Sequence, residues 1–180
     1  GVQNTFLGSL AGDAITTGFA NVAIGFQALS SDDVGTNTVA IGQNALFAQN
    51  FSTATATYNV AVGQSAGAAV TTGVRNTFVG GLSGDGTDDG TDNVGVGYGA
   101  LTANSANQNT AVGSEALSAC TGANNSAVGY AAGFEITSGV NNLALGKDAL
   151  RTGSPGGPAT SDNNVVGLGD ENIGSLHCQT

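Results

Sequence analysis

The residues best suited to catalysis are few, and most of them lie near the end of the chain. The single histidine, His177, stands beside Cys178. A thiol nucleophile and its imidazole base normally come from separate parts of a fold. The three glutamates, Glu115, Glu135 and Glu171, are scattered and offer no carboxylate pair for glycoside hydrolysis. The sequence therefore predicts no enzyme activity, no catalytic residue and no cofactor.

An acidic stretch, GDGTDDGTDN at residues 84–93, raises the question of a cation site. Calcium prefers several carboxylate oxygens held in one loop. This stretch differs from the EF-hand order, because Thr87 stands at the second ligand position. It also occurs once, whereas calcium-binding nonapeptides work by repetition. We interpret it as a polar turn and predict no metal site.

The charge balance excludes several classes of partner. Three basic residues, Arg75, Lys147 and Arg151, stand against 13 acidic ones, for a net charge of −10. No basic cluster is present to neutralise nucleic-acid phosphates or anionic lipids. No apolar run is long enough to span a membrane. Cys120 and Cys178 do not make a disulfide framework, and we expect both to be reduced.

Positions along the chain are set by a repeat, N-x-A-[IV]-G, found in ten copies. Its closing glycine recurs at a nearly constant interval, and the two longer intervals, Gly42 to Gly63 and Gly146 to Gly167, indicate four-residue insertions. The copies are NTFLG (4–8), NVAIG (21–25), TVAIG (38–42), NVAVG (59–63), NTFVG (76–80), NVGVG (93–97), NTAVG (109–113), NSAVG (125–129), NLALG (142–146) and NNVVG (163–167).

A second level of repetition groups these copies into blocks. Four residues after the closing glycine stands only Gly or Leu, in the order Gly-Leu-Leu-Gly, twice. Residues 4–75 and 76–141 therefore form two four-unit blocks. We predict one repeat array over 1–161 and a C-terminal unit with a junction segment over 162–180. The opening GVQNTFLG is echoed by GVRNTFVG at 73–80, so we expect the chain to begin partway through a unit of a longer protein.

Each unit is too short for a useful helix and is typical of a short strand closed by a turn. With 30 glycines and no tryptophan or methionine, the chain can fill only a thin core. The sequence predicts an all-β fold, a parallel β-solenoid or β-roll of about ten 16–17-residue rungs, where a rung is one turn of the coil. Stacking at ~4.8 Å gives a rod about 50 Å long. A second short strand is expected at the [IV]-T pairs of AITT, AVTT and EITS.

Strand alternation predicts which side chains face inward. We place the aliphatic residue before each closing glycine, such as Ile24, inside the coil. The residue before it, usually alanine as at Ala23, then faces outward and needs a cover. Ordering a rung costs more entropy than burial of a few small aliphatics returns, which favours packing of the alanine faces of several chains in a homotrimer. The opening asparagines, such as Asn21, are expected to stack as an amide ladder.

The loops of variable length are the candidates for recognition, because loops carry function on rigid scaffolds. They cover 30–37, 47–58 and 151–162. Phe47, Phe51 and Tyr58 in the second loop either stack on sugar rings or cap the gap that the insertion leaves, and the sequence leaves both interpretations open. The glycosylation acceptors at Asn50 and Asn124 matter only in a eukaryotic secretory route.

The phrases NTAVGSEAL, NVAIGFQAL and NSAVGYAAG resemble the N-T-A-[IV]-G-x-x-A-L repeats of bacteriophage tail fibres and spikes, over almost the whole chain. Residues 162–180 look like the segment that precedes an intramolecular chaperone of the endosialidase type. The repeats are also similar to the N-S-V-A-I-G repeats in the heads of trimeric autotransporter adhesins, whose units are shorter.

These resemblances imply a homotrimeric, extracellular, non-enzymatic rod. We expect a structural and adhesive segment of a phage tail fibre in the virion that presents loops to a receptor on the host-cell surface, a glycan or a protein. The alternative is the head of a trimeric adhesin on a bacterial surface. An ice-binding solenoid would need a T-x-T array on successive rungs, and TATAT occurs once, at 53–57.

Overall fold

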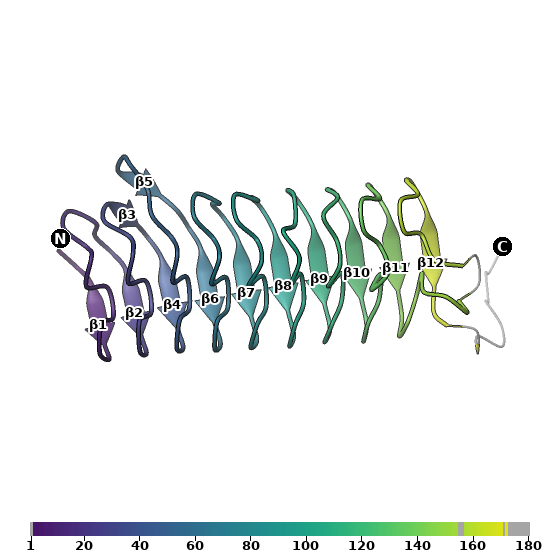
Figure 1. Ribbon diagram of the computed structural model, residues 1–180, viewed down its shortest axis with the longest axis horizontal. Coiled ribbons are helices and arrows are strands. Elements are labelled where there is room, and N and C mark those ends of the chain that lie inside the picture. The colour runs from purple at the N-terminus through teal and green to yellow at the C-terminus, as the bar shows by residue number, and fades with distance from the viewer. Residues whose placement is uncertain (1, 155–156, 171, 173–180) are drawn as a thin grey trace, which may run out of the picture.

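The chain is an all-β parallel solenoid (Figure 1). The computed structural model describes residues 2–154, 157–170 and 172. Within that part there is no helix, and hence none that could cross a membrane. One ten-stranded parallel sheet runs the length of the rod in the order β1 (Thr5–Leu7), β2 (Val22–Ile24), β4 (Val39–Ile41), β6 (Val60–Val62), β7 (Thr77–Val79), β8 (Val94–Val96), β9 (Thr110–Val112), β10 (Ser126–Val128), β11 (Leu143–Leu145) and β12 (Val166–Leu168).

The strands pair in the register that the repeat predicts. Val22 pairs with Val39, and Val39 with Val60, so equivalent positions stack along the axis. A separate two-stranded pair, β3 (Gly35–Thr36) and β5 (Thr55–Ala56), bulges from the early rungs at the insertion (Figure 1). The prediction of a second strand at the [IV]-T pairs is wrong, because none of these pairs forms a strand in the part of the chain that the structure describes. Thr71 donates its backbone N–H to the Asp88 carbonyl at 2.9 Å, but the segment bends and no strand develops.

In the last repeat the strand lies two residues later in the sequence than the motif NNVVG predicts. Leu143 pairs with Val166 and Ala144 with Gly167, so Gly169 and not Gly167 follows the strand. Val165 takes the place of the ladder asparagine, because its N–H donates to Asn142 Oδ1 at 2.8 Å. VVGLG contains two overlapping matches to the motif, and only pairing with β11 distinguishes them.

The predicted facing of the strands is wrong, and the two faces exchange roles. The alanines in the middle of the strands, such as Ala23, Ala61 and Ala127, are fully buried within the single chain. The aliphatic residues that follow them point outward, and Val128 is 46% exposed. Because the alanine face is already covered by the chain's own coil, it offers no surface for another chain.

The interior explains why the alanine position points inward. The Gly-or-Leu position after each strand sits at positive φ and also faces the core, where Leu29, Leu46, Leu101 and Leu117 are fully buried. A leucine there leaves room for only a methyl group beneath the strand. Where glycine stands instead, larger residues fill the space: Phe78 opposite Gly84, Val70 beside Gly67 and Ile136 beside Gly133. The Gly-Leu-Leu-Gly order is therefore a pattern of volume compensation within one chain.

The expected asparagine ladder is confirmed. Along successive regular rungs, Oδ1 accepts the backbone N–H of the next asparagine, and in most of them Nδ2 donates to a glycine carbonyl. Asn76 Oδ1 accepts from Asn93 N at 2.9 Å, and Asn76 Nδ2 donates to the Gly90 carbonyl at 2.7 Å. Both groups lie in the interior, where an unpaired backbone group is costly. The ladder thus supplies hydrogen-bond partners for backbone groups at the corner of the coil that the strands leave unpaired.

The ladder is interrupted at Thr38, where the motif lacks asparagine, and buried side chains bridge the gap. Gln49 Oε1 accepts from Asn59 Nδ2 at 2.8 Å, and Gln49 Nε2 donates to Thr38 Oγ1 at 3.2 Å. Gln49 Nε2 also donates to the buried carboxylate of Asp32 at 2.6 Å. Because this glutamine supplies the missing amide, stacking continues through the irregular rung.

Candidate functional site

The outer face of the main sheet carries two rows of side chains that are partly to well exposed among the described residues. They come from the first and third residues of each strand. The row after the alanine is aliphatic throughout, and Val79, Val112, Val128 and Leu145 in it are between 37% and 46% exposed. We call these two rows the outer strip. Its members are Thr5, Leu7, Val22, Ile24, Val39, Ile41, Val60, Val62, Thr77, Val79, Val94, Val96, Thr110, Val112, Ser126, Val128, Leu143, Leu145, Val166 and Leu168.

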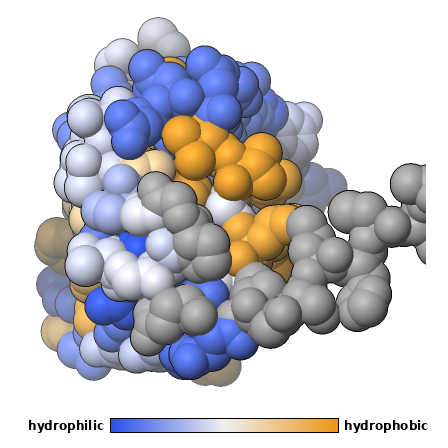
Figure 2. Space-filling model, turned by 90° about the vertical axis from the view of Figure 1, so that its right-hand side faces the viewer, coloured by the Kyte–Doolittle hydropathy of each residue, from blue (hydrophilic) through white to orange (hydrophobic). Residues whose placement is uncertain are grey.

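Hydrophobic residues are also unevenly distributed when the rod is seen from its end. In the view from the β12 end the most prominent hydrophobic residues lie right of the centre and others lie at the left edge, while hydrophilic residues cover the top of the cross-section (Figure 2). Exposed apolar residues that occur singly need no explanation, whereas a contiguous array indicates a contact surface. The outer strip is such an array, because its rows recur on successive strands.

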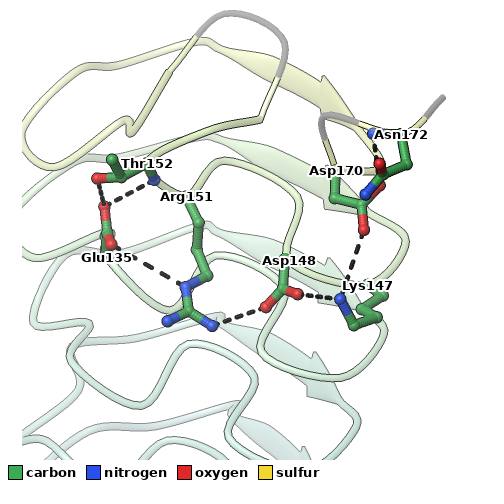
Figure 3. A pocket seen from close by; sticks show the side chains of 7 residues that line it. All are labelled: Glu135, Lys147, Asp148, Arg151, Thr152, Asp170 and Asn172. Carbon is green, nitrogen blue, oxygen red and sulfur yellow. Dashed lines mark hydrogen bonds and ion pairs between the residues drawn. The ribbon is translucent and has the colours of Figure 1, made fainter.

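A second surface is formed by the turns that follow the strands, and it is hollowed in two places. The first hollow, of about 360 Å³, lies near the C-terminal end of the rod and collects Lys147 and Arg151, two of the three basic residues of the chain (Figure 3). Glu135, Asp148 and Asp170 line it as well. We call it the charged hollow.

The charges in this hollow are paired with one another (Figure 3). Lys147 lies between Asp148 and Asp170, and Arg151 Nη1 lies 2.7 Å from Asp148 Oδ1. The hydrogen bond from Lys147 lowers the pKa of Asp148. The pKa of Asp170 is lowered first by the Asn172 backbone N–H and then by Lys147. The carboxylates of Asp148 and Asp170 are therefore held ionised, and each is positioned by a partner of opposite charge.

The second hollow, of about 320 Å³, adjoins the first and is lined by aromatic and small residues. Tyr98 and Phe134 supply rings, and Glu115 supplies a carboxylate. Tyr98 is 59% exposed. Phe134 belongs to this hollow, and the Arg151 guanidinium of the charged hollow lies 4.8 Å from its ring centroid. The contact between Arg151 and Phe134 thus links the linings of the two hollows, and together we call the two hollows the turn groove.

The three loops proposed for recognition differ in how much of each is buried and in whether they line the turn groove. Loop 30–37 packs into the coil, with Asp32 and Thr36 buried. In loop 47–58 the aromatics divide: Phe51 is buried, as the capping interpretation expects, whereas Phe47 and Tyr58 are exposed, Tyr58 by 60%. Their stacking on sugar rings stays a prediction. Loop 151–162 contributes Arg151 and Thr152 to the charged hollow.

The acidic stretch 84–93 folds as turns laid over the neighbouring rungs. Asp92 forms a two-point ion pair with Arg75, and Asp88 accepts from Thr71 Oγ1. Burial raises the pKa of Asp85. Among the residues that the structure describes, no three His, Cys, Asp or Glu side chains gather closely enough to hold a metal ion.

The neighbouring pair His177 and Cys178 and the glutamate Glu171 lie outside the described residues. Of the scattered glutamates, Glu115 and Glu135 line the two neighbouring hollows of the turn groove. The aromatic side of that groove was missed, since Tyr98 and Phe134 do not lie in the loops of variable length. The sequence did hold a signal for this groove: Gly81 and Gly99 occupy the first and second turn positions after a strand, where the equivalent turns from Ser9 to Asp148 carry a side chain.

Cys120 is buried in the core, with Asn125 Nδ2 3.3 Å from its Sγ. Burial raises the pKa of this thiol, so little reactive thiolate forms near neutral pH. In a Cys178→Ser variant, we expect a thiol reagent to label Cys120 about 100-fold more slowly in the native protein than in denaturant. Absorbance of the released thiolate measures both rates, and equal rates would contradict the buried placement.

No protein-family model matches the chain, and no curated protein or solved structure matches it. The class of protein therefore follows from the geometry alone: a parallel β-solenoid with an asparagine ladder inside, an apolar strip along its sheet and a groove along its turns.

Proposed function

We propose that this chain is a structural and adhesive segment of a trimeric phage tail fibre, located in the virion and used for attachment to a host cell. The observation that carries the proposal is the outer strip, which runs over successive strands and is partly to well exposed among the described residues. The repeat phrases support the choice of tail fibre through their resemblance to such proteins.

The outer strip suits contact with further copies of the same chain. A second copy offers an array with the same spacing, so two rods aligned side by side match rung for rung. Burying aliphatic side chains stabilises such a contact by about 25 cal/mol per Å². The strip also holds two rows per strand, and a closed threefold arrangement requires each chain to touch two neighbours. One row for each neighbour satisfies that requirement.

Assembly is tested by the mass of the protein under native conditions, measured by light scattering. We expect three times the chain mass. Val128→Asp places a charge in the strip, and we expect it to reduce the mass to that of one chain, since an unpaired buried charge is costly. Ser138→Asp, at an exposed position outside the strip, is the matched control and should keep the threefold mass.

Two outcomes would contradict this assembly. A wild-type mass of one chain would overturn the trimer. A threefold mass in Val128→Asp, with the circular-dichroism spectrum of the wild type, would remove the outer strip as the interface. The spectrum is recorded for each variant, because it separates a dissociated solenoid from an unfolded one.

The attachment role is tested on the virus whose genome encodes the chain. Antibodies raised against the purified protein are expected to label its tail fibres in electron micrographs and to block adsorption to the host. A parent gene that continues into a membrane anchor instead of an intramolecular chaperone would replace the tail fibre with the adhesin alternative.

A further inference from the structure

We propose that the turn groove binds a neutral oligosaccharide, with one pyranose ring stacked on Tyr98 and hydroxyl groups bonded to Glu115 and to the carboxylates of the charged hollow. The inference deepens the proposed attachment function and rests on it for its biological purpose. The observations that carry it are the shape of the groove, its exposed ring and the closed pairing of its charges.

Two turn positions near Tyr98 carry glycine: Gly99 lines the aromatic hollow, and Gly81 lies beside the tyrosine ring. The first turn position after each strand carries Ser, Phe, Gln, Tyr or Lys in the other rungs from Ser9 to Lys147, and glycine only at Gly81. A Cβ at Gly81 would lie 3.6 Å from Tyr98 Cδ2, so this glycine leaves the ring uncovered on that side.

Gly99 at the second turn position is not required by the backbone. Its φ is +64°, yet the equivalent Gln27, Ser65 and Glu115 adopt φ of 55°, 56° and 60°. A Cβ at Gly99 would meet only Thr102 at 3.7 Å and Glu115 at 4.0 Å, which are ordinary contacts. Because neither φ nor crowding demands glycine, its effect at this position is to leave space in the groove.

The lining combines the groups that recognise sugars. An exposed aromatic face packs against the apolar C–H face of a pyranose, and polar groups at its edge fix the orientation. Tyr98 supplies that face, and Glu115 supplies acceptors for paired hydroxyls. Thr102 and Ser118 line the same hollow. A purely apolar ligand would leave the adjoining charged hollow without matching polar groups.

The pairing of charges selects a neutral ligand. Lys147 and Arg151 are already engaged by Asp148, Asp170 and Glu135, so an added anion or cation would have to displace an existing partner. The net charge of −10 further disfavours an anion. Hydroxyl groups bond to the remaining lone pairs of paired carboxylates without breaking an ion pair.

Binding is tested on an array of neutral and acidic oligosaccharides, with affinities of the hits measured by calorimetry. We expect the wild type to bind neutral members only. Tyr98→Ala and Gly99→Gln are expected to weaken binding about tenfold or more, the first by removing the ring and the second by filling the groove. Tyr130→Ala removes another exposed tyrosine, one that lines neither hollow, and should leave the affinity unchanged.

Three results would overturn the groove as a saccharide site: no binding to any neutral member, binding confined to acidic members, or full affinity in Gly99→Gln. Gly99→Gln should keep the wild-type fold with a modest fall in its unfolding temperature, because Gln27 occupies the same turn position at positive φ but such a residue is strained there relative to glycine. If no oligosaccharide on the array binds, while the mass is threefold and the antibodies label tail fibres, the saccharide site is refuted and the proposed function is not. A one-chain mass with intact sugar binding would refute the trimer alone.

Discussion

Asn76→Ala is expected to destabilise the fold strongly. The substitution leaves two buried backbone groups without a partner, the Asn93 N–H and the Gly90 carbonyl. Each unsatisfied buried group costs about 1–3 kcal/mol, and two of them double that loss in the free energy of unfolding. Guanidinium unfolding followed by circular dichroism measures the change, with the wild type and the variant compared at equal protein concentration.

Gln64→Ala is the matched control for this substitution. It also removes a side-chain amide, but Gln64 is exposed and its Nε2 bonds only to the neighbouring Ser65 hydroxyl. A surface change of this kind alters the free energy of unfolding by about 0.5 kcal/mol or less. Equal losses in the two variants would mean that the ladder contributes nothing beyond the loss of an amide.

Phe78→Ala is expected to cost about 3–5 kcal/mol, because Phe78 is the largest fully buried side chain and the coil cannot close the cavity. Gly84→Leu is expected to be as damaging on its own, since even a Cβ at Gly84 would lie 2.3 Å from Phe78 Cε1. The double variant Phe78→Ala/Gly84→Leu should recover most of the loss. It recreates the pairing of Ala111 with Leu117 in another rung.

A double-mutant cycle in the same denaturant assay measures this compensation. We expect a coupling free energy of several kcal/mol, in the sense that the second change relieves the first. Losses that simply add would show that the two positions do not share one interior space. The cycle therefore also tests the inward facing of the alanine position, because an outward Phe78 would not respond to Gly84.

Much of the fold follows from the spacing of the repeats. Strands such as β4 and β6 pair in the predicted register, since identical motifs stack when each rung returns to the same edge. The asparagine ladder follows from the same reasoning. The sequence did not settle the facing of the strands, because alternation divides residues between two faces without saying which is inside.

A signal for the correct facing was nevertheless present in the residues. The two strands with phenylalanine at the alanine position, at Phe6 and Phe78, are followed by Gly12 and Gly84 rather than by leucine. Such an exchange of volume requires both positions to share an interior. The turn groove was harder to predict, since it depends on which side chains are missing from adjacent turns, and each of those turns belongs to a different repeat.

The stacking of rungs also determines how the rod bears a load. β1 and β12 lie at opposite ends of one sheet (Figure 1), so tension along the axis pulls each rung away from the next. Most rungs share one hydrogen-bonding pattern, and the irregular rung at Thr38 departs from it. Under force the molecule should therefore lengthen in discrete steps, with about 50 Å of chain released by each rung that detaches. Such a rod yields by stages and keeps its remaining length intact.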